Sequence, residues 1–359
     1  MPYAIAQSGV IPGVFYLVVL GGMVLLLHLM FGEIALRTTE KHRLIGYASV
    51  YVGSWAKILI TISTFVGVVG ALLAYIILAG DFLQIIVSSL IPISSFGLSI
   101  LFWLFGSFFI IRGIQSIAKM ELLMNVVLFV VVGIIFVFAL PHVAIEHYTM
   151  FNPSFMFLPY GVVLFAFMGL SAIPEIAELF KRKKEKRNLD NVIIWASVIC
   201  GALYALFTFF VIGVSGSETS KDALRGLAPF LGDRIVLLGA IFGLVAISAS
   251  FLVVGNYLKN SLRHDYHVSS RVSVLIVVFL PILLFAMGLR DFILILGVVG
   301  AAVGALEGIV ITLAFRRAKN MGDRKPEYSL RIPGYIFFIV GGVVCIGFIF
   351  EVFELWTHF

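Results

Sequence analysis

One apolar stretch of the chain is interrupted where a membrane-spanning helix would be continuous. Between residues 157 and 180 the apolar run contains Gly169, Ser171 and Pro174, and six basic residues follow it within the segment 181–187. A helix broken at this depth leaves backbone N–H and C=O groups unpaired, which is tolerated only where they are buried in protein or line a polar cavity. The second half-helix, from Pro174 onward, would favour an anion such as a carboxylate at its N-terminus. Free C=O groups of the first half would suit an ammonium group, so the break could hold an amino acid.

The residues around this break form the candidate substrate site. The large apolar side chains among them would line a roomy pocket, which favours aromatic or other large neutral amino acids. The alternative for each aromatic side chain is packing or contact with lipid. The candidate substrate-binding residues are Phe165, Ala166, Phe167, Met168, Gly169 and Ser171.

Glutamates within or close to apolar spans are functional hypotheses by default, because a charge there is costly. Glu175 is one turn beyond the break and could couple transport to protons through a desolvated carboxyl group, and Glu178 lies in the same short helix. The alternative is that both interact with the helix dipole and face the cytoplasm. Glu307 lies about ten residues before Arg316, deep enough to need a partner or water, and could serve gating or ion coupling.

Other polar or small residues in the spans have structural interpretations. His28 is a lone histidine in an apolar span, and we expect its hydrogen-bonding groups to be satisfied. Glu33 and Arg37 are spaced as an i, i+4 ion pair at the inner end of the first full span. The span 292–315 carries glycines on one face, which predicts close helix packing. These glycines are Gly297, Gly300, Gly304 and Gly308.

The rest of the chain must build a scaffold in the membrane for these groups. Of its 359 residues, 61% are hydrophobic and 12% are charged, whereas an average globular chain carries about a quarter charged residues. Long apolar runs recur along the whole length, so the sequence predicts an all-α polytopic membrane protein. The net charge of +6 comes from short loops and indicates cytoplasmic anchoring, not a nucleic-acid partner.

Ten full spans are predicted, and a short apolar segment, residues 2–10, precedes them. Pro12 and Gly13 separate this segment from the first span. The loops on one side hold 21 of the 25 Lys and Arg residues, which identifies that side as cytoplasmic and places the C-terminus, after Glu354, outside. The predicted spans are 14–36, 55–80, 95–111, 122–140, 157–180, 191–214, 235–257, 272–289, 292–315 and 334–353.

Three loops are long enough to carry structure of their own. The first inner loop, residues 38–53, is amphipathic enough to lie along the inner membrane surface. We expect short helices in the polar outer loops 141–156 and 215–234.

The segment 2–10 and the broken span occupy matching positions, because four full spans follow each of them. Short or Gly/Pro-interrupted segments at matching positions point to the binding site of a transporter built from inverted repeats. The alternative is that glycine and proline are simply common in membrane helices. We expect a single permease domain over residues 1–359, with repeats at 1–140 and 157–315 and an extra helix at 334–353.

Several of these segments carry a resemblance to a known family. The motif PYAIAQSG, a first span ending FGEIALR, and the stretches GALLAYIILAG and GVVLFAFMGLSAIPEIAELF resemble the amino acid/auxin permease group. Within that group, the chain is most similar to the bacterial aromatic and hydroxy amino acid permeases of the tryptophan/tyrosine type. The resemblance covers essentially the whole chain. It implies the five-plus-five inverted-repeat fold of the sodium-coupled leucine transporter with one extra helix, ion-coupled symport, and a prokaryotic plasma (inner) membrane.

The resemblance also implies further site residues. The partner break would lie just before Pro2, so that Pro2 and Tyr3 join the substrate site. Ser248 and Ser250 would offer hydroxyl oxygens to a coupling ion. Hydroxyl oxygen suits sodium, whereas the bacterial relatives are mostly proton-driven, so the ion stays open between H⁺ and Na⁺. The alternative for each serine is a hydrogen bond to the carbonyl four residues earlier.

The chain departs from the family at its start. In the family a Gly-x-Gly-type turn and the inner half of the first helix precede the Pro-Tyr-Ala motif, whereas Met1 stands directly before Pro2 here. We expect that translation begins upstream of this methionine. The alternative is an N-terminally truncated, non-transporting permease.

Other functional classes fit the sequence less well. A membrane enzyme would need a nucleophile with a base, or a His/Asp/Glu cluster in a span, and a channel would need a filter repeated by symmetry. The sequence has neither pattern. We therefore expect a secondary active amino acid symporter without a cofactor or metal, whose partners are the amino acid, the coupling ion and the lipid bilayer.

Overall fold

The computed structural model describes residues 1–359 except 88–92, 113–117, 265–267, 344–346, 348 and 350–359. The described residues form α-helices and short 3-10 turns, with no strand among them. Helices pair their own backbone groups, which an apolar bilayer interior requires. The α-helices are α1 (Pro2–Ser8), α2 (Val10–Arg37), α3 (Leu44–Tyr51), α4 (Ser54–Val87), α5 (Ser95–Arg112), α6 (Ala118–Ala139), α7 (Pro159–Phe167), α8 (Ala172–Leu179), α9 (Lys183–Lys186), α10 (Leu189–Ser215), α11 (Ala228–Leu231), α12 (Asp233–His264), α13 (Ser270–Ala286) and α14 (Phe292–Met321).

The predicted all-α polytopic class is confirmed. Within the described residues, seven helical segments are long and apolar enough to cross a membrane: α2, α4, α5, α7 with α8, α10, α12 and α14. The other three predicted spans fall on shorter apolar helices, Phe129–His142, Ser270–Ala286 and Gly334–Val343. The last predicted span, 334–353, lies partly outside the described residues.

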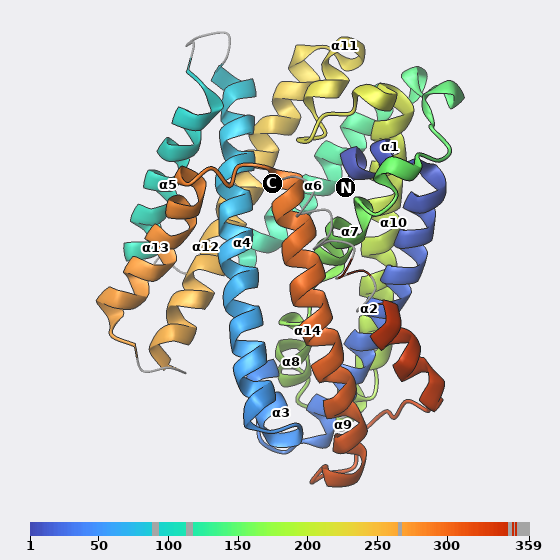
Figure 1. Cartoon of the computed structure of the whole chain (residues 1–359), viewed down its shortest axis with the longest axis vertical. Coiled ribbons are helices and arrows are strands. Elements are labelled where there is room, and N and C mark those ends of the chain that lie inside the picture. The colour runs from blue at the N-terminus through green and yellow to red at the C-terminus, as the bar shows by residue number, and fades with distance from the viewer. Residues whose placement is uncertain (88–92, 113–117, 265–267, 344–346, 348, 350–359) are drawn as a thin grey trace.

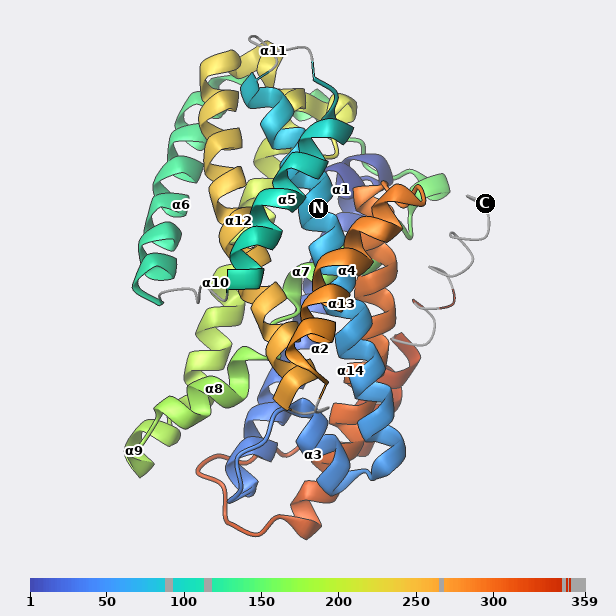
Figure 2. The same cartoon turned by 90° about the vertical axis from the view of Figure 1, so that its left-hand side faces the viewer.

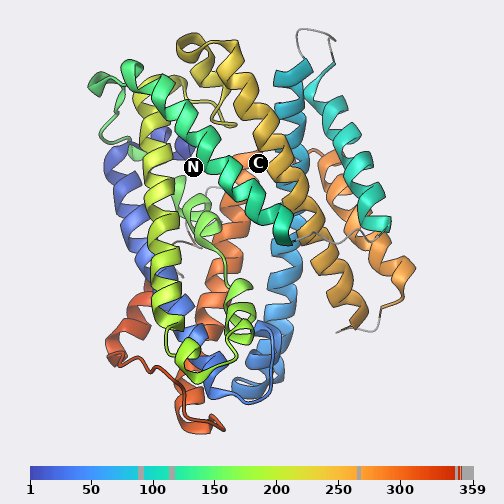
Figure 3. The ribbon, with the colours of Figure 1, turned by 180° about the vertical axis from the view of Figure 1, so that it is seen from behind.

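Two long helices form the centre of the molecule. Helices α4 and α14 run side by side along its long axis (Figure 1), and α7 packs against α14. Helices α5, α12 and α13 lie on one flank, while α2 and α10 lie together on the other. Seen from behind, α6 slants across α10 and α12 (Figure 3). Of the most apolar window of α14, 67% is buried inside the protein, the largest share among the seven candidate spans.

The glycine face of α14 packs directly on α7, as predicted. A Cβ added at Gly300 would collide with the carbonyl oxygen of Gly161 on α7, and one added at Gly161 would collide with that of Gly297. One turn further along, the space beside Gly304 is filled by the side chain of Leu164. Small residues at these positions let the two backbones touch.

The first break in the chain lies at Gly9, not at Pro12 and Gly13 as predicted. Helix α1 ends at Ser8 and α2 begins at Val10, because Gly9 adopts a φ of +99°. A proline in the first turn has no intrahelical hydrogen bond to lose, so Pro12 is compatible with α2. The carbonyl oxygen of Met150 lies 2.6 Å from where a Cβ of Gly9 would stand, so this turn also requires glycine.

The loops 141–156 and 215–234 carry short helices, as expected, and the loop 38–53 contains one as well. The first inner loop contains α3, which lies at the same end of the molecule as α8 and α9 (Figure 2). The outer loops contain the 3-10 turns η1 (Leu140–His142), η2 (Ile145–His147), η3 (Pro153–Phe155), η4 (Gly216–Glu218) and η5 (Arg225–Leu227), together with α11.

The predicted ion pair at the inner end of α2 is confirmed and has a further role. Arg37 Nη2 lies 2.7 Å from a carboxylate oxygen of Glu33, whose side chain is fully buried. The same carboxylate accepts hydrogen bonds from Ser329 Oγ at 3.0 Å and from the backbone N–H of Leu330 at 2.6 Å. Glu33 therefore fixes the loop after α14 against α2.

Candidate functional site

The predicted break is present between α7 and α8. The chain leaves α7 after Phe167 and enters α8 at Ala172, and residues 168–171 between them are not helical. The backbone N–H groups of residues 169–171 donate no hydrogen bond within the described part of the chain, and the C=O groups of residues 167 and 168 accept none there. Unpaired donors and acceptors thus lie within a few residues of one another in this short segment, in which Leu170 is buried and Ser171 is exposed.

Pro174 lies inside α8, whereas the sequence interpretation placed the start of the half-helix there. It is the third residue of this helix, where its missing N–H breaks no complete helical turn. The C=O of Leu170, which that N–H would have reached, accepts a hydrogen bond of 3.2 Å from Ile173 N. The half-helix therefore begins two residues earlier, at Ala172.

A tyrosine on α10 caps the end of α7. The hydroxyl group of Tyr204 donates a hydrogen bond of 2.9 Å to the carbonyl oxygen of Ala166. Its ring also contacts the ring of Phe167 edge to face, with centroids 5.4 Å apart. Tyr204 thereby holds the end of the broken helix in place.

The polar contacts continue to α4 and α12. The hydroxyl group of Tyr75 on α4 hydrogen-bonds the side chain of Ser250 on α12, and Tyr75 and Tyr204 lie close enough to interact electrostatically. Ser248 behaves differently, because its hydroxyl group donates to the carbonyl oxygen of Leu244 at 2.7 Å. Of the two predicted ion-site serines, Ser250 therefore bonds across to α4, whereas Ser248 bonds to its own helix.

His28 lies beside the break and its hydrogen bonding is not satisfied, contrary to the sequence interpretation. A Cβ added at Gly169 would stand 3.9 Å from His28 Cε1, so the imidazole faces the gap. The residue is only 7% exposed, and its Nε2 atom is buried without a hydrogen-bond partner in the described structure. A buried nitrogen without a partner is unfavourable by about 1–3 kcal/mol.

Glu307 continues the glycine face of α14. It lies seven residues after Gly300 and three after Gly304, which is the same side of the helix. Since those glycines pack on α7, Glu307 lies on the face turned toward the end of α7, where the break begins. Its carboxyl group makes no hydrogen bond or ion pair with any described residue.

The three large side chains of the candidate pocket point in two directions. Phe165 and Met168 pack beside the same apolar cluster as Tyr75. Phe167 packs away from them between α2 and α10, because its ring lies 3.0 Å from where a Cβ of Gly21 would stand. Phe165 and Met168 therefore border one core cluster, whereas Phe167 lies in the packing between α2 and α10.

The expected desolvation of Glu175 is not found. Its side chain is 62% exposed, and a carboxylate oxygen lies 3.5 Å from Arg43 Nη2 in the first inner loop. Glu178 pairs with the same arginine at 3.1 Å and with Lys41 at 3.8 Å. Both carboxylates therefore join α8 to the loop 38–53, a pairing that neither interpretation of the sequence had predicted. Ser171, at the start of α8, is exposed on the same side.

Pro2 and Tyr3 lie on α1, which contacts α7 and α10. Pro2 is the first residue of the helix and is buried. The ring of Tyr3 lies below Lys221 of the outer loop, with Nζ 5.8 Å from the ring centroid, so this side chain interacts with the outer loop.

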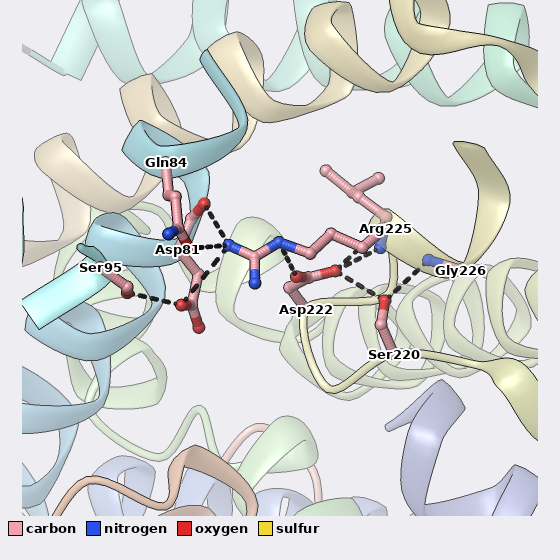
Figure 4. A network of polar contacts seen from close by, with 8 residues as sticks. Asp81, Gln84, Ser95, Ser220, Asp222, Arg225 and Gly226 are labelled. Atoms are coloured by element: carbon pink, nitrogen blue, oxygen red, sulfur yellow. Dashed lines mark hydrogen bonds and ion pairs between the residues drawn. The ribbon is translucent and has the colours of Figure 1, made fainter. Parts of the chain in front are cut away.

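A polar cluster joins the loop 215–234 to α4 and α5 (Figure 4). Arg225 in η5 donates from Nη2 to the carbonyl oxygen of Asp81 at 3.1 Å and to Gln84 Oε1 at 2.8 Å, both on α4. Its Nε lies 3.3 Å from a carboxylate oxygen of Asp222 in its own loop. Ser95, at the start of α5, donates to the carboxylate of Asp81 at 2.7 Å. The outer loop is thereby fixed to α4.

A second ion pair fixes the same loop to α14. Lys221 Nζ lies 2.5 Å from a carboxylate oxygen of Asp291, which caps α14 by accepting from the N–H groups of Ile293 and Leu294 at 3.0 and 3.1 Å. Burial acts to raise the pKa of Asp291, but the Lys221 ammonium and the two N–H donors outweigh it and leave the pKa below its usual value.

The sequence interpretation missed Tyr75, Tyr204 and the role of His28. Tyrosines in spanning helices usually lie at the membrane interfaces, where their rings are half in water. Tyr75 and Tyr204 lie well inside long apolar helices, and that position is the signal that could have identified them.

Comparison with known proteins identifies the family of the chain. The family model described as transmembrane amino acid transporter protein matches residues 1–352. Glutamine transporter 2 of Aliivibrio fischeri is 22% identical over 272 residues, which covers 72% of this chain and 70% of the relative. Both comparisons support the resemblance at the level of amino acid transport. The chain belongs to the transmembrane amino acid transporter protein family.

Proposed function

We propose that this chain is a secondary active symporter that moves a neutral amino acid across a prokaryotic plasma membrane by alternating access. The observation that carries the proposal is the break at residues 168–171, with N–H groups free on one side and C=O groups free on the other. The N–H groups of residues 169–171 would bind the substrate carboxylate at the start of α8. The C=O groups of residues 167 and 168 would accept from its ammonium group.

We assign the chain to the five-plus-five inverted-repeat architecture with one extra helix. The first repeat would contain α1, α2, α4, α5 and α6, and the second would contain α7 with α8, α10, α12, α13 and α14. The assignment is supported by the short helix that begins each half and by the contact between α1 and α7. Alternating access in such transporters is largely the movement of one bundle against the other around the site.

The substrate would be a neutral amino acid. Phe165 and Met168 supply apolar surface on one side of the break, which suits a large side chain. The relative from Aliivibrio fischeri is described as a glutamine transporter, which makes glutamine a second candidate beside the aromatic amino acids.

The coupling ion in this proposal is the proton, carried by Glu307. Its carboxyl group faces the break region without a charged partner, so a proton could bind and leave without disrupting an ion pair. A sodium ion bound near Ser250 is the alternative, because a hydroxyl oxygen is a ligand for a hard cation.

Uptake by the purified protein in liposomes tests the proposal. Labelled glutamine, tyrosine, tryptophan and serine would each be offered with an inward proton gradient, an inward sodium gradient, or neither. We expect accumulation with the proton gradient alone. Accumulation that requires sodium would favour the alternative ion, and no uptake of any amino acid under any gradient would contradict the proposed function.

A further inference from the structure

The imidazole of His28 is a polar group without a partner at the site where we propose that substrate binds. It is 7% exposed, and its Nε2 makes no hydrogen bond to any described residue. An apolar side chain of similar size would fill this position on α2 without leaving a buried nitrogen unpaired. The arrangement is therefore explained better by a ligand than by packing.

The register of α2 directs this side chain to the break. Gly21 contacts the ring of Phe167, the last residue of α7. His28 follows Gly21 by two helical turns on the same face and lies next to Gly169, two residues further along the chain. The face of α2 that carries Gly21 and His28 therefore lies alongside Phe167 and Gly169. The imidazole is next to Gly169, whose N–H group is free.

We infer that His28 binds a neutral hydrogen-bonding group on the substrate's side chain, either a carboxamide or a hydroxyl group. The inference rests on the proposed function, in which the backbone groups of the break take the carboxylate and the ammonium group. A neutral imidazole has one donor and one acceptor nitrogen. Carboxamides and hydroxyl groups both donate and accept, so they pair with Nε2 in either tautomer, whereas a carboxylate or an ammonium group pairs with only one.

The consequence is selectivity between amino acids of similar shape. A site built to hydrogen-bond a substrate group discriminates strongly against an analogue that lacks the group, because the site's own polar atom is then left unpaired. The transporter should prefer glutamine to methionine, or tyrosine to phenylalanine. The pair that shows the larger preference identifies which of the two groups His28 binds.

The test measures these preferences in the wild type, in His28→Leu and in His28→Asn. Ratios of kcat/KM for glutamine over methionine and for tyrosine over phenylalanine are obtained from competitive uptake. Thermal stabilisation of the purified protein by each amino acid gives the same ratios for binding. We expect His28→Leu to lower the larger ratio by about tenfold or more, and His28→Asn to restore part of it. His142→Leu, which removes an exposed outer-loop histidine, is the matched control and should leave both ratios unchanged.

The outcomes separate this inference from the proposed function. Unchanged ratios in His28→Leu, with substrate still transported or bound, would overturn the role of His28 and leave symport intact. Changed binding ratios in a protein that shows no ion-driven uptake would support His28 and contradict symport. If none of these four amino acids binds the wild type, the role of His28 is overturned, whereas the proposed symport is judged by the liposome uptake that includes tryptophan and serine.

Discussion

The hydroxyl group of Tyr204 on α10 donates a 2.9 Å hydrogen bond to the carbonyl oxygen of Ala166, where α7 stops. A helix that ends inside an apolar protein leaves its last carbonyl groups without partners. This contact pairs one of them and leaves the next two free. Tyr204 therefore helps to set which backbone groups remain available in the break.

Removing this hydroxyl group should weaken the site without unfolding the protein. In Tyr204→Phe the Ala166 carbonyl loses its partner, which is worth about 1 kcal/mol, or roughly fivefold in affinity. We expect KM for uptake to rise by about that factor. Tyr148→Phe is the matched control, because Tyr148 donates to the carbonyl oxygen of Phe209 on the same helix, outside the break. An equal rise of KM in both variants would contradict a specific role for Tyr204.

The contact between α7 and α14 predicts that two glycine-to-alanine substitutions differ strongly in their effect on the stability of the protein. In Gly161→Ala the new methyl group would meet the backbone of Gly297, so the helices must separate, and we expect a loss of about 1–3 kcal/mol of stability. Gly22 lies within α2 and has nothing within 4 Å of an added Cβ, so Gly22→Ala should be neutral or slightly stabilising. Thermal unfolding of the purified variants measures the difference, and similar unfolding temperatures would contradict the close packing.

The Lys221–Asp291 pair predicts a pH-dependent contribution to stability. Because the pKa of Asp291 is lowered in the folded protein, its contribution is present above the unfolded value of about 3.9 and is lost as the pH falls through the lower folded value. Both side chains are partly exposed, so salt screening should keep the contribution below about 1 kcal/mol.

Asp291→Asn should therefore unfold at a lower temperature than the wild type near pH 7, and at the same temperature once the pH lies well below 3.9. Unfolding curves recorded across this pH range test the sign. A difference that grows as the pH falls would show that the carboxylate is not stabilised by Lys221 and the helix N–H groups.

Substitution of the two glutamates considered for proton coupling, Glu307 and Glu175, should have opposite effects on proton-driven uptake. Glu307→Gln removes the carboxyl group on the face of α14 turned toward the end of α7 and should abolish accumulation driven by a proton gradient, while exchange of substrate across the membrane continues. Glu175→Gln should retain full proton-driven uptake, because Glu175 is exposed and paired with Arg43. Proton-driven accumulation that survives in Glu307→Gln would remove Glu307 from the coupling mechanism.

The sequence predicted those features that depend on local composition. Apolar runs located the long helices, Gly169 located the break, and the spacing of Gly297, Gly300 and Gly304 identified the face that packs on α7. The first break was predicted at Pro12 and Gly13 instead of Gly9 because a proline often ends a helix. A helix nevertheless tolerates proline in its first turn. Such errors arise where one residue type has two possible structural roles.

The side-chain partners could not be predicted, because they come from segments far apart in the chain. Tyr75 meets Ser250 across α4 and α12, and Glu175 meets Arg43 across the inner surface. His28 was assigned a satisfied environment because lone histidines usually have one. Only the packing of α2 against the break leaves its Nε2 without a partner.

The outer loop has a consequence for how the surrounding solution acts on the protein. Its two fixing side chains, Lys221 and Arg225, are 46% and 43% exposed, so dissolved ions reach them. Screening at a Debye length of about 8 Å weakens such pairs, whereas it has little effect on uncharged hydrogen bonds such as the one from Tyr204 to the Ala166 carbonyl. Higher ionic strength should therefore loosen the attachment of the loop 215–234 to α4 and α14 while leaving the hydrogen bonds at the break unchanged. In the proposed transporter, dissolved salt would then act on the protein chiefly at this one loop.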